Sequence, residues 1–358
     1  MTGNPPADRQ PDAPAPADPA APRPGTPAAA VPTAPAASGR PASLTAQPRI
    51  RLGTLPTPLL PAPRLSEAVG VEIWLKRDDL TGLGLGGNKV RGLEFLLADA
   101  LERGCDTLVT GGGPGSNWAM LAALAARTRG LDTVLVCYGD PVPAVGNMHL
   151  ATTIGADIQF TGDKDRASVD SGVAAVADEL RAAGRTPYPL GRGGATAVGA
   201  LGYLTAAEEL AGQLADAGCA ATATWLATGS CGTQAGLVAG AAWQGLGPVV
   251  GVTVSRPPEE CVERVATIAR GAADLAGVPA PDGPPTVVDG HIGPGYGLRS
   301  PEGDAAAELV ARTEGVFLDP IFAAKAMAGL LAAVRRGEVA GPVVFLVTGG
   351  APTLFTTH

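Results

Sequence analysis

Lys89 has the sequence context that best suits covalent chemistry with a carbonyl compound. The chain has four lysines against 22 arginines, and only Lys89 lies in a glycine-dense loop, residues 82–89 (GLGLGGNK), that opens a predicted helix. A Schiff-base enzyme needs a lysine in such a loop, near a phosphate site and partly removed from water. A merely solvated cation is disfavoured there, because a positive charge at a helix N-terminus opposes the helix dipole.

The other three lysines have plainer interpretations. Lys164 lies in the polar segment GDKDR, which predicts a solvated loop. Lys76 adjoins the charged run at residues 77–79, and this predicts a surface ion pair. Lys325 lies among alanines in the middle of a predicted helix. Lys89 is therefore the predicted catalytic lysine.

The segment GSCGT, residues 229–233, lies between a predicted strand and a predicted helix. Its glycines let backbone N–H groups approach an anion, and the start of a helix adds a favourable dipole. The Walker ending and the dinucleotide spacing of glycines are both absent, so the loop suits one phosphate group. A tight turn with a threonine cap is an equally good interpretation of the segment alone. The candidate phosphate-binding residues are Gly229, Ser230, Cys231, Gly232 and Thr233.

A third candidate, the pair Ser116 and Asn117, opens another predicted helix after the glycine loop at residues 111–117. The commonest use of serine and asparagine at such a position is to cap the helix. The alternative is a hydroxyl and an amide directed at a ligand. The residues alone favour the cap.

Elements of the right kind are predicted around these loops. Short β-branched runs alternate with Ala/Leu-rich helical runs, which predicts an α/β fold with open twisted parallel sheets and helices on both faces. Ligands of such sheets bind on the loops that follow the carboxyl ends of the strands. The predicted strands are 71–75, 107–110, 133–138, 157–160, 222–227, 249–254 and 343–348, and the predicted helices are 91–103, 117–128, 168–183, 201–216, 234–243, 259–276, 303–314 and 322–336.

The composition of the chain limits its possible partners and its cellular compartment. Thirteen of the 34 prolines lie in residues 1–48, a stretch without aromatic residues that predicts a disordered Pro/Ala-rich arm. The formal charge of −8 argues against nucleic-acid or anionic-membrane partners. We find no apolar run of the ~20 residues that span a bilayer and no secretory signal. Five cysteines without C-x-x-C spacing indicate reduced thiols in the cytoplasm, and with three histidines we expect no metal site.

Taken together, eight segments resemble the D-cysteine desulfhydrase and 1-aminocyclopropane-1-carboxylate deaminase family. The family consists of pyridoxal-5′-phosphate (PLP) enzymes with the tryptophan synthase β-like fold, and the resemblance runs in order through nearly all of residues 50–356. It is carried by GGNKVRGLEFLLADAL (86–101), GCDTLVTGGGPGSN (104–117), LGRGGATAVGALGY (190–203), ATGSCGTQAGL (227–237), GVTVS (251–255), PGYGL (294–298), TEGVFLDPIFAAKAMAGL (313–330) and FLVTGGAPTLF (345–355).

The resemblance implies roles for single residues. Lys89 matches the lysine that holds the cofactor as a Schiff base, and residues 229–233 match the phosphate loop. Asn117 matches the asparagine at the cofactor's 3′-oxygen, and Ser116 the serine that binds the substrate carboxylate or moves a proton. Two further matches are Thr348, near the pyridine nitrogen, and Tyr296, an active-site tyrosine.

The resemblance also implies an organisation in two domains. A small domain at residues 92–198 would be inserted into a large PLP-binding domain formed by residues 49–91 and 199–358. PLP would lie in the cleft between them, and we expect a homodimer in the cytoplasm.

Some positions depart from the family pattern. Trp118 stands where the family usually has histidine or glutamine, and Phe322 and Ala323 stand where it often has tyrosine followed by threonine or glutamate. Gly92 replaces a lysine near the phosphate. The predicted substrate pocket, formed by Ser116, Asn117, Trp118, Tyr296 and Phe322, is therefore more apolar than usual.

These matches favour a PLP-dependent lyase or deaminase that acts on a small amino acid. Lys89 would remove the α-proton, a β-leaving group such as thiolate would depart, and hydrolysis would give a 2-oxo acid and ammonia. The aromatic residues Trp118 and Phe322 suggest, as an alternative, β-replacement or side-chain modification of a bulkier amino acid in specialised biosynthesis. A non-catalytic PLP-binding protein is a further alternative, which the retention of Lys89 and Ser116 disfavours.

Overall fold

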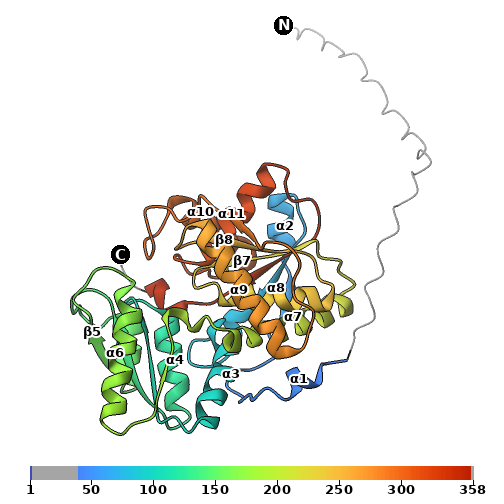
Figure 1. The fold of residues 1–358 in the computed structure, drawn as a ribbon. Helices are drawn as coiled ribbons and strands as arrows, with labels where there is room; N and C mark the ends of the chain where they lie inside the picture. The colour runs from blue at the N-terminus through green and yellow to red at the C-terminus, as the bar shows by residue number, and fades with distance from the viewer. Residues whose placement is uncertain (2–38, 356–358) are drawn as a thin grey trace. The chain divides into compact units, whose positions relative to one another are not determined.

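The computed structural model of the protein describes Met1 and residues 39–355 (Figure 1). The expected disorder of residues 2–38 concerns residues outside this described part. The rest of the expected arm, residues 39–48, is ordered, and here the prediction is wrong. The short helix α1 (Ala42–Thr45) packs against α9 (Pro258–Ala276), and Leu44 is only 3% exposed. Leu44 enters a cluster with Phe95 and Val265, and the side-chain nitrogen of Gln47 donates to the carbonyl oxygen of Leu275 at 3.0 Å.

We expect Leu44→Ala to lower the free energy of unfolding by about 2 kcal/mol, because it removes a buried side chain and leaves a cavity. Urea unfolding measures the change. Leu60→Ala is the matched control, since Leu60 is 43% exposed and should change the stability little. Equal unfolding midpoints for the two variants would contradict the packing of α1.

Six strands form the larger sheet, and most of this sheet is parallel. The strand order is β1-β2-β10-β7-β8-β9, and all neighbours pair parallel except β1 with β2. The predicted sheet is thus parallel apart from one short edge strand that the sequence pattern did not reveal. The strands are β1 (Leu59–Pro61), β2 (Ile73–Arg77), β7 (Ala223–Thr228), β8 (Val249–Thr253), β9 (Thr286–Val288) and β10 (Val343–Val347).

The smaller sheet has four parallel strands in the order β5-β4-β3-β6. The glycine loop that carries Ser116 leaves it at the carboxyl end of β3. Its strands are β3 (Thr107–Gly112), β4 (Asp132–Cys137), β5 (Asp157–Phe160) and β6 (Pro187–Pro189).

Helices cover both faces of each sheet, as the alternating pattern predicted. In the smaller sheet Val134 and Val136 point toward α6, whereas Leu135 between them packs under α4 and α5. Figure 1 shows α4 and α6 beside this sheet, and α7, α8 and α9 in the other part of the fold. The helices are α2 (Pro63–Val69), α3 (Lys89–Glu102), α4 (Asn117–Arg127), α5 (Gly146–Thr153), α6 (Ser168–Ala182), α7 (Ala197–Asp216), α8 (Gly232–Gln244), α10 (Pro301–Glu314) and α11 (Ala323–Arg335).

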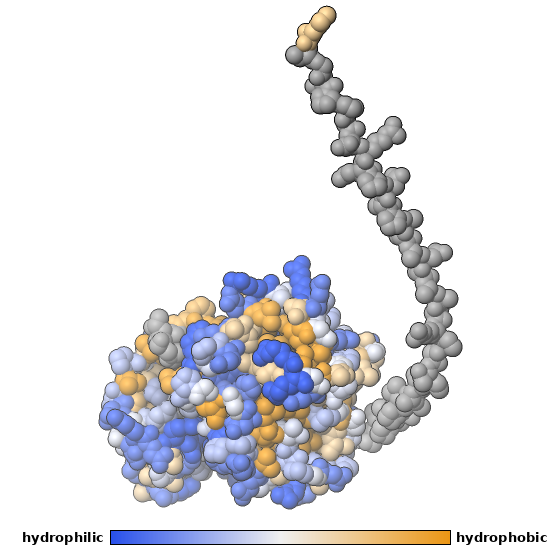
Figure 2. All heavy atoms as spheres, turned by 90° about the horizontal axis from the view of Figure 1, so that it is seen from above, coloured by the Kyte–Doolittle hydropathy of each residue, from blue (hydrophilic) through white to orange (hydrophobic). Residues whose placement is uncertain are grey.

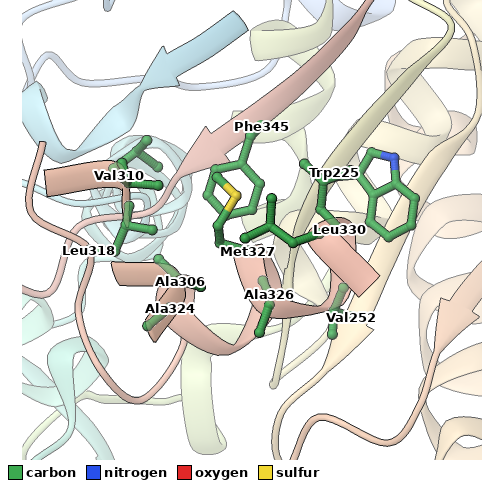
Figure 3. Packing of buried hydrophobic residues seen from close by; sticks show 14 of the residues in the cluster. Trp225, Val252, Ala306, Val310, Leu318, Ala324, Ala326, Met327, Leu330 and Phe345 are labelled. Atoms are coloured by element: carbon green, nitrogen blue, oxygen red, sulfur yellow. The ribbon is translucent and has the colours of Figure 1, made fainter. Parts of the chain in front are cut away.

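The main apolar core lies between the larger sheet and α10 and α11. Met327 and Leu330 of α11 point toward Phe345 of β10 in Figure 3, and all three are fully buried. The next residue of β10, Leu346, faces the opposite cluster with Tyr203 of α7. On the face drawn in Figure 2, hydrophobic residues reach the surface between hydrophilic ones. None of the helices in the described part is both long and apolar enough to cross a membrane.

A buried network of charges ties α3 to the larger sheet. Arg91 of α3 donates to Asp78 at 2.7 Å and to Glu209 of α7, and Lys76 forms an ion pair with the same glutamate at 2.5 Å. Lys76 is 2% exposed, so the predicted surface ion pair is wrong. Its ammonium group is covered by α7, where it contacts Glu209 and Gln213, and the partly buried glutamate offsets the cost of its burial. The network fixes the first turn of α3, where Lys89 lies.

Candidate active site

Loops from the carboxyl ends of strands in both sheets line one pocket with an empty volume of about 910 Å³, counting its open mouth. The loops follow β3 in the smaller sheet and β7, β8 and β10 in the larger one. This is the place where open parallel sheets bind ligands. The residues predicted from sequence that line it are Lys89, Ser116, Asn117, Trp118, Gly229, Ser230, Cys231, Thr233, Tyr296, Phe322 and Thr348; Gly232 lines a small adjoining cavity together with Lys89.

Lys89 is the first residue of α3 and is half-buried in the pocket wall. Burial lowers the pKa of its ammonium group from 10.5 to about 8, although the charge of Asp319 acts in the opposite direction. The preceding loop needs its glycines: at Gly86, φ is 70° and a Cβ atom would lie 2.1 Å from the oxygen of Asp79. The backbone N–H of Asn88 donates to Thr348 at 2.9 Å. The loop therefore places the weakly basic amine of Lys89 near Thr348, a second candidate residue.

The glycine loop at residues 229–233 links β7 to α8, which begins at Gly232. Cys231 has a φ of 78° and is the one non-glycine residue in the described part with a positive φ. Such a conformation costs about 1–2 kcal/mol and is frequent at ligand-binding turns. The loop lies tightly against residue 193, where a Cβ atom would approach that of Ser230 to 2.3 Å. The tight turn before α8 thus lines the pocket, where the start of a helix favours an anion.

Ser116 caps α4, since its hydroxyl accepts the backbone N–H of Ala119 at 3.2 Å. The cap interpretation is therefore confirmed, and the residue also lines the pocket. Asn117 accepts at its Oδ1 a hydrogen bond of 2.6 Å from Asn147, a buried residue of α5. Because Asn147 occupies that oxygen, the amide nitrogen of Asn117 is left to donate to a ligand. Asn147 was not foreseen, since it lies 30 residues further along the chain.

Thr348 follows β10 and is 6% exposed. Its hydroxyl is buried and has no hydrogen-bond partner among the described residues. An unpartnered buried hydroxyl is costly in a protein interior. The group therefore suits a polar ligand atom inside the pocket.

The aromatic residues form one wall of the pocket. The rings of Tyr296 and Phe322 meet edge to face, with centroids 6.2 Å apart, and burial raises the pKa of the Tyr296 phenol. Lys325 is fully buried and its Nζ donates to the carbonyl oxygens of residues 292 and 295, which fixes the loop that carries Tyr296. Trp118 is 4% exposed, and its Nε1 donates to Thr110 at 2.9 Å. Its indole therefore belongs to the pocket wall.

Several pocket residues were missed by the sequence reasoning. Arg166, Arg192 and Arg256 all line the pocket, and nothing in their local sequence separates them from the other arginines. Asp319 is buried behind the pocket and accepts the N–H groups of residues 321–323. Burial raises the pKa of its carboxyl group to about 6, while those N–H donors favour the charged form. Its position in the segment LDPIF offered a weak signal.

The fold and the match of sequence identify the class. A family model described as pyridoxal-phosphate dependent enzyme matches residues 50–349, and the chain belongs to this family.

Among its relatives is a D-cysteine desulfhydrase of Yersinia pestis (strain Pestoides F), 40% identical over 88% of this chain and 97% of that protein. A protein of Pyrococcus abyssi, provisionally named 1-aminocyclopropane-1-carboxylate deaminase, is 39% identical over 88% of this chain and 95% of its own. A crystal structure of an ACC deaminase homologue has a TM-score of 0.82 at 36% identity, covering 88% of this chain and 95% of that one.

The residues of the pocket fit pyridoxal phosphate. The turn at residues 229–233 suits a phosphate group, and the amine of Lys89 has a lowered pKa, as a Schiff-base lysine needs. The unpartnered hydroxyl of Thr348 suits a heteroaromatic nitrogen. Bound pyridoxal phosphate supplies an electron sink for the charge left on the α-carbon.

The lowered pKa predicts how covalent loading of the cofactor depends on pH. Only the neutral amine attacks an aldehyde, so we expect the loading rate of the apoprotein to rise with pH through a midpoint near 8. An unperturbed lysine would give a midpoint near 10.5. Stopped-flow absorbance after mixing apoprotein with PLP measures the rate. A rise that continues without a midpoint up to pH 10 would contradict the predicted environment of Lys89.

Proposed function

We propose that this protein catalyses PLP-dependent α,β-elimination on a small amino acid, in the manner of a D-cysteine desulfhydrase, releasing a 2-oxo acid and ammonia. The observation that carries the proposal is the convergence of Lys89, the Ser116–Asn117 pair and the turn at residues 229–233 on one pocket. The relatives named D-cysteine desulfhydrase add support, because they match 88% of the chain.

Each residue has a proposed role. Lys89 holds the cofactor, exchanges with the substrate amine and, once free and neutral, accepts the α-proton at its Nζ. Ser116 and Asn117 bind the substrate carboxylate and the cofactor's 3′-oxygen, and Asn147 keeps the amide of Asn117 correctly oriented. Residues 229–233 bind the phosphate, Thr348 meets the pyridine nitrogen, and Tyr296 lies beside the reacting side chain.

The proposed site lies in a chain that we divide into two domains. We propose that residues 92–198 form a small domain and residues 49–91 with 199–358 a large one. The distribution of the strands supports this, since β3 to β6, the four strands of the smaller sheet, all lie within residues 92–198.

We further propose a homodimer in the cytoplasm. The five free cysteines support a reducing compartment, and sedimentation would test the dimer.

The two alternatives receive less support. The motive for β-replacement on a bulky substrate was an aromatic pocket surface, which the pocket does have, but the relatives that match the chain are named D-cysteine desulfhydrase and 1-aminocyclopropane-1-carboxylate deaminase. A non-catalytic protein would have no need for an amine of lowered pKa at Lys89.

The deciding experiment is product analysis with D- and L-forms of cysteine, serine and their β-substituted derivatives. We expect a 2-oxo acid and ammonia in equal amounts from one enantiomer. Release of no 2-oxo acid from any of them would overturn the proposal.

A further inference from the structure

Arg166 is a cation in the pocket that pairs with no carboxylate of the described residues. It lies in the loop between β5 and α6, and its side chain lines the pocket. Its guanidinium carbon lies 3.9 Å from the centre of the Tyr296 ring. One of its nitrogens donates to the carbonyl oxygen of Ser255 at 3.2 Å. Within residues 39–355 no carboxylate forms an ion pair with it.

The other two arginines of the pocket differ in this respect. Arg192 forms an ion pair of 2.8 Å with Asp170. Arg256 pairs with Glu260 and donates to the oxygen of Gly229 at 3.1 Å. Their charges are thus compensated, whereas Arg166 has no carboxylate partner in the described part of the chain.

The geometry around Arg166 suits the binding of an anion. A guanidinium group has five N–H donors in one plane, and stacking on a ring leaves its edges free for a bidentate contact with a carboxylate or phosphate. One donor of Arg166 is used by Ser255. The Tyr296 ring under the guanidinium is held in place, because Lys325 fixes the loop of Tyr296 and Phe322 packs against the ring. An arginine held in this way loses little entropy when an anion binds.

We propose that Arg166 binds an acidic group on the side chain of the substrate, so that the enzyme prefers small amino acids with an anionic side chain or leaving group. The inference rests on the proposed function, which gives the other two anions their own donors: residues 229–233 for the cofactor phosphate, and Ser116 with Asn117 for the α-carboxylate. Arg166 is then left for a third anion.

A phosphorylated serine shows what the step would be. The α-proton passes to Lys89, the bond between Cβ and oxygen breaks, and its electron pair leaves with phosphate. Addition of one water and loss of ammonia then give pyruvate. Arg166 would hold the departing phosphate group during bond cleavage.

The test compares aspartate with asparagine, which have nearly the same shape and differ in charge. Binding to the holoenzyme is read from the absorption spectrum of the bound cofactor, for both enantiomers. We expect wild-type protein to bind aspartate about 10- to 100-fold more tightly than asparagine, the effect of one charge-assisted contact. Arg166→Gln should reduce this preference to about two-fold, and Arg166→Lys should keep part of it. Arg181→Gln is the control, because Arg181 is an exposed arginine of α6 outside the pocket.

Elimination kinetics give a second readout. Arg166→Gln should raise KM for O-phosphoserine about 10-fold or more, whereas Arg181→Gln should leave it nearly unchanged. Equal affinities of the wild type for aspartate and asparagine would overturn the proposal. So would a loss of affinity for PLP itself in Arg166→Gln, because that would make Arg166 a phosphate anchor of the cofactor. Failure of every amino acid to yield a 2-oxo acid would instead refute the proposed function. The comparison of aspartate with asparagine binding would still decide the role of Arg166.

Discussion

Lys89→Ala is expected to lose covalent attachment of PLP and to eliminate β-substituted amino acids far more slowly than the wild type. Proton transfer by a placed base alone is worth ~10²- to 10⁴-fold in rate, and the variant also loses the exchange step between amines. Reduction of the wild-type holoenzyme with borohydride, followed by peptide mapping, should place the pyridoxyl group on Lys89. Steady-state release of 2-oxo acid measures the loss of rate.

Lys164→Ala is the matched control for this variant, since Lys164 is exposed in the loop after β5 and lies outside the pocket. It should retain wild-type activity and the label on Lys89. Lys76 and Lys325 are unsuitable as controls, because both are buried and bind neighbouring groups. A pyridoxyl group found on Lys76, Lys164 or Lys325 would show that the assignment is wrong.

The second large effect concerns 1-aminocyclopropane-1-carboxylate. This amino acid has no α-hydrogen, so opening its ring needs acid–base groups other than the base that removes an α-proton. Phe322 lines the pocket just before α11, and Ala323, the first residue of α11, is fully buried in the apolar core, so neither side chain can donate or accept a proton there. We therefore expect oxobutyrate formation well below the ~1 s⁻¹ typical of enzymes, while amino acids with an α-hydrogen and a good leaving group react.

Phe322→Tyr tests the reason for this expectation. It adds a phenol beside Tyr296, whose ring centroid lies 6.2 Å from that of Phe322. Oxobutyrate formation should rise by about 10-fold or more, with little change in elimination from cysteine. Oxobutyrate production by the wild type at ~1 s⁻¹ or faster would refute the argument and would make Tyr296 or Ser116 the source of the proton chemistry.

The sequence predicted those pocket residues whose signal is local. Lys89, the turn at residues 229–233 and the pair at 116–117 each carry their signal in adjacent residues, and the parallel sheets place the ends of their strands together. The unpaired state of Arg166 is different in kind, because it depends on which carboxylates happen to fold near it. The same reason explains the wrong expectation for Lys76, whose local run of charges resembles a surface segment.

The fold shows a similar division. The long helices α3, α6 and α9 were predicted within two residues at each end, because their apolar periodicity extends over several turns. The strands β1, β6 and β9 were missed, and each has only three residues. A run of three residues carries no period that separates a strand from a loop. The packing of Leu44 was missed because one apolar residue in a Pro/Ala-rich segment gives no pattern at all.

The contact between Trp118 and residue 194 limits how the pocket can be altered. A Cβ atom at Gly194 would lie 2.1 Å from the tip of the indole, and φ at this glycine is 59°. Any side chain there would meet both the ring and a strained backbone. The two positions are therefore coupled, and Trp118 can be exchanged only for something smaller while Gly194 must stay. Shortening Trp118 would open space in the pocket wall, so this single position offers a means of admitting a longer amino acid.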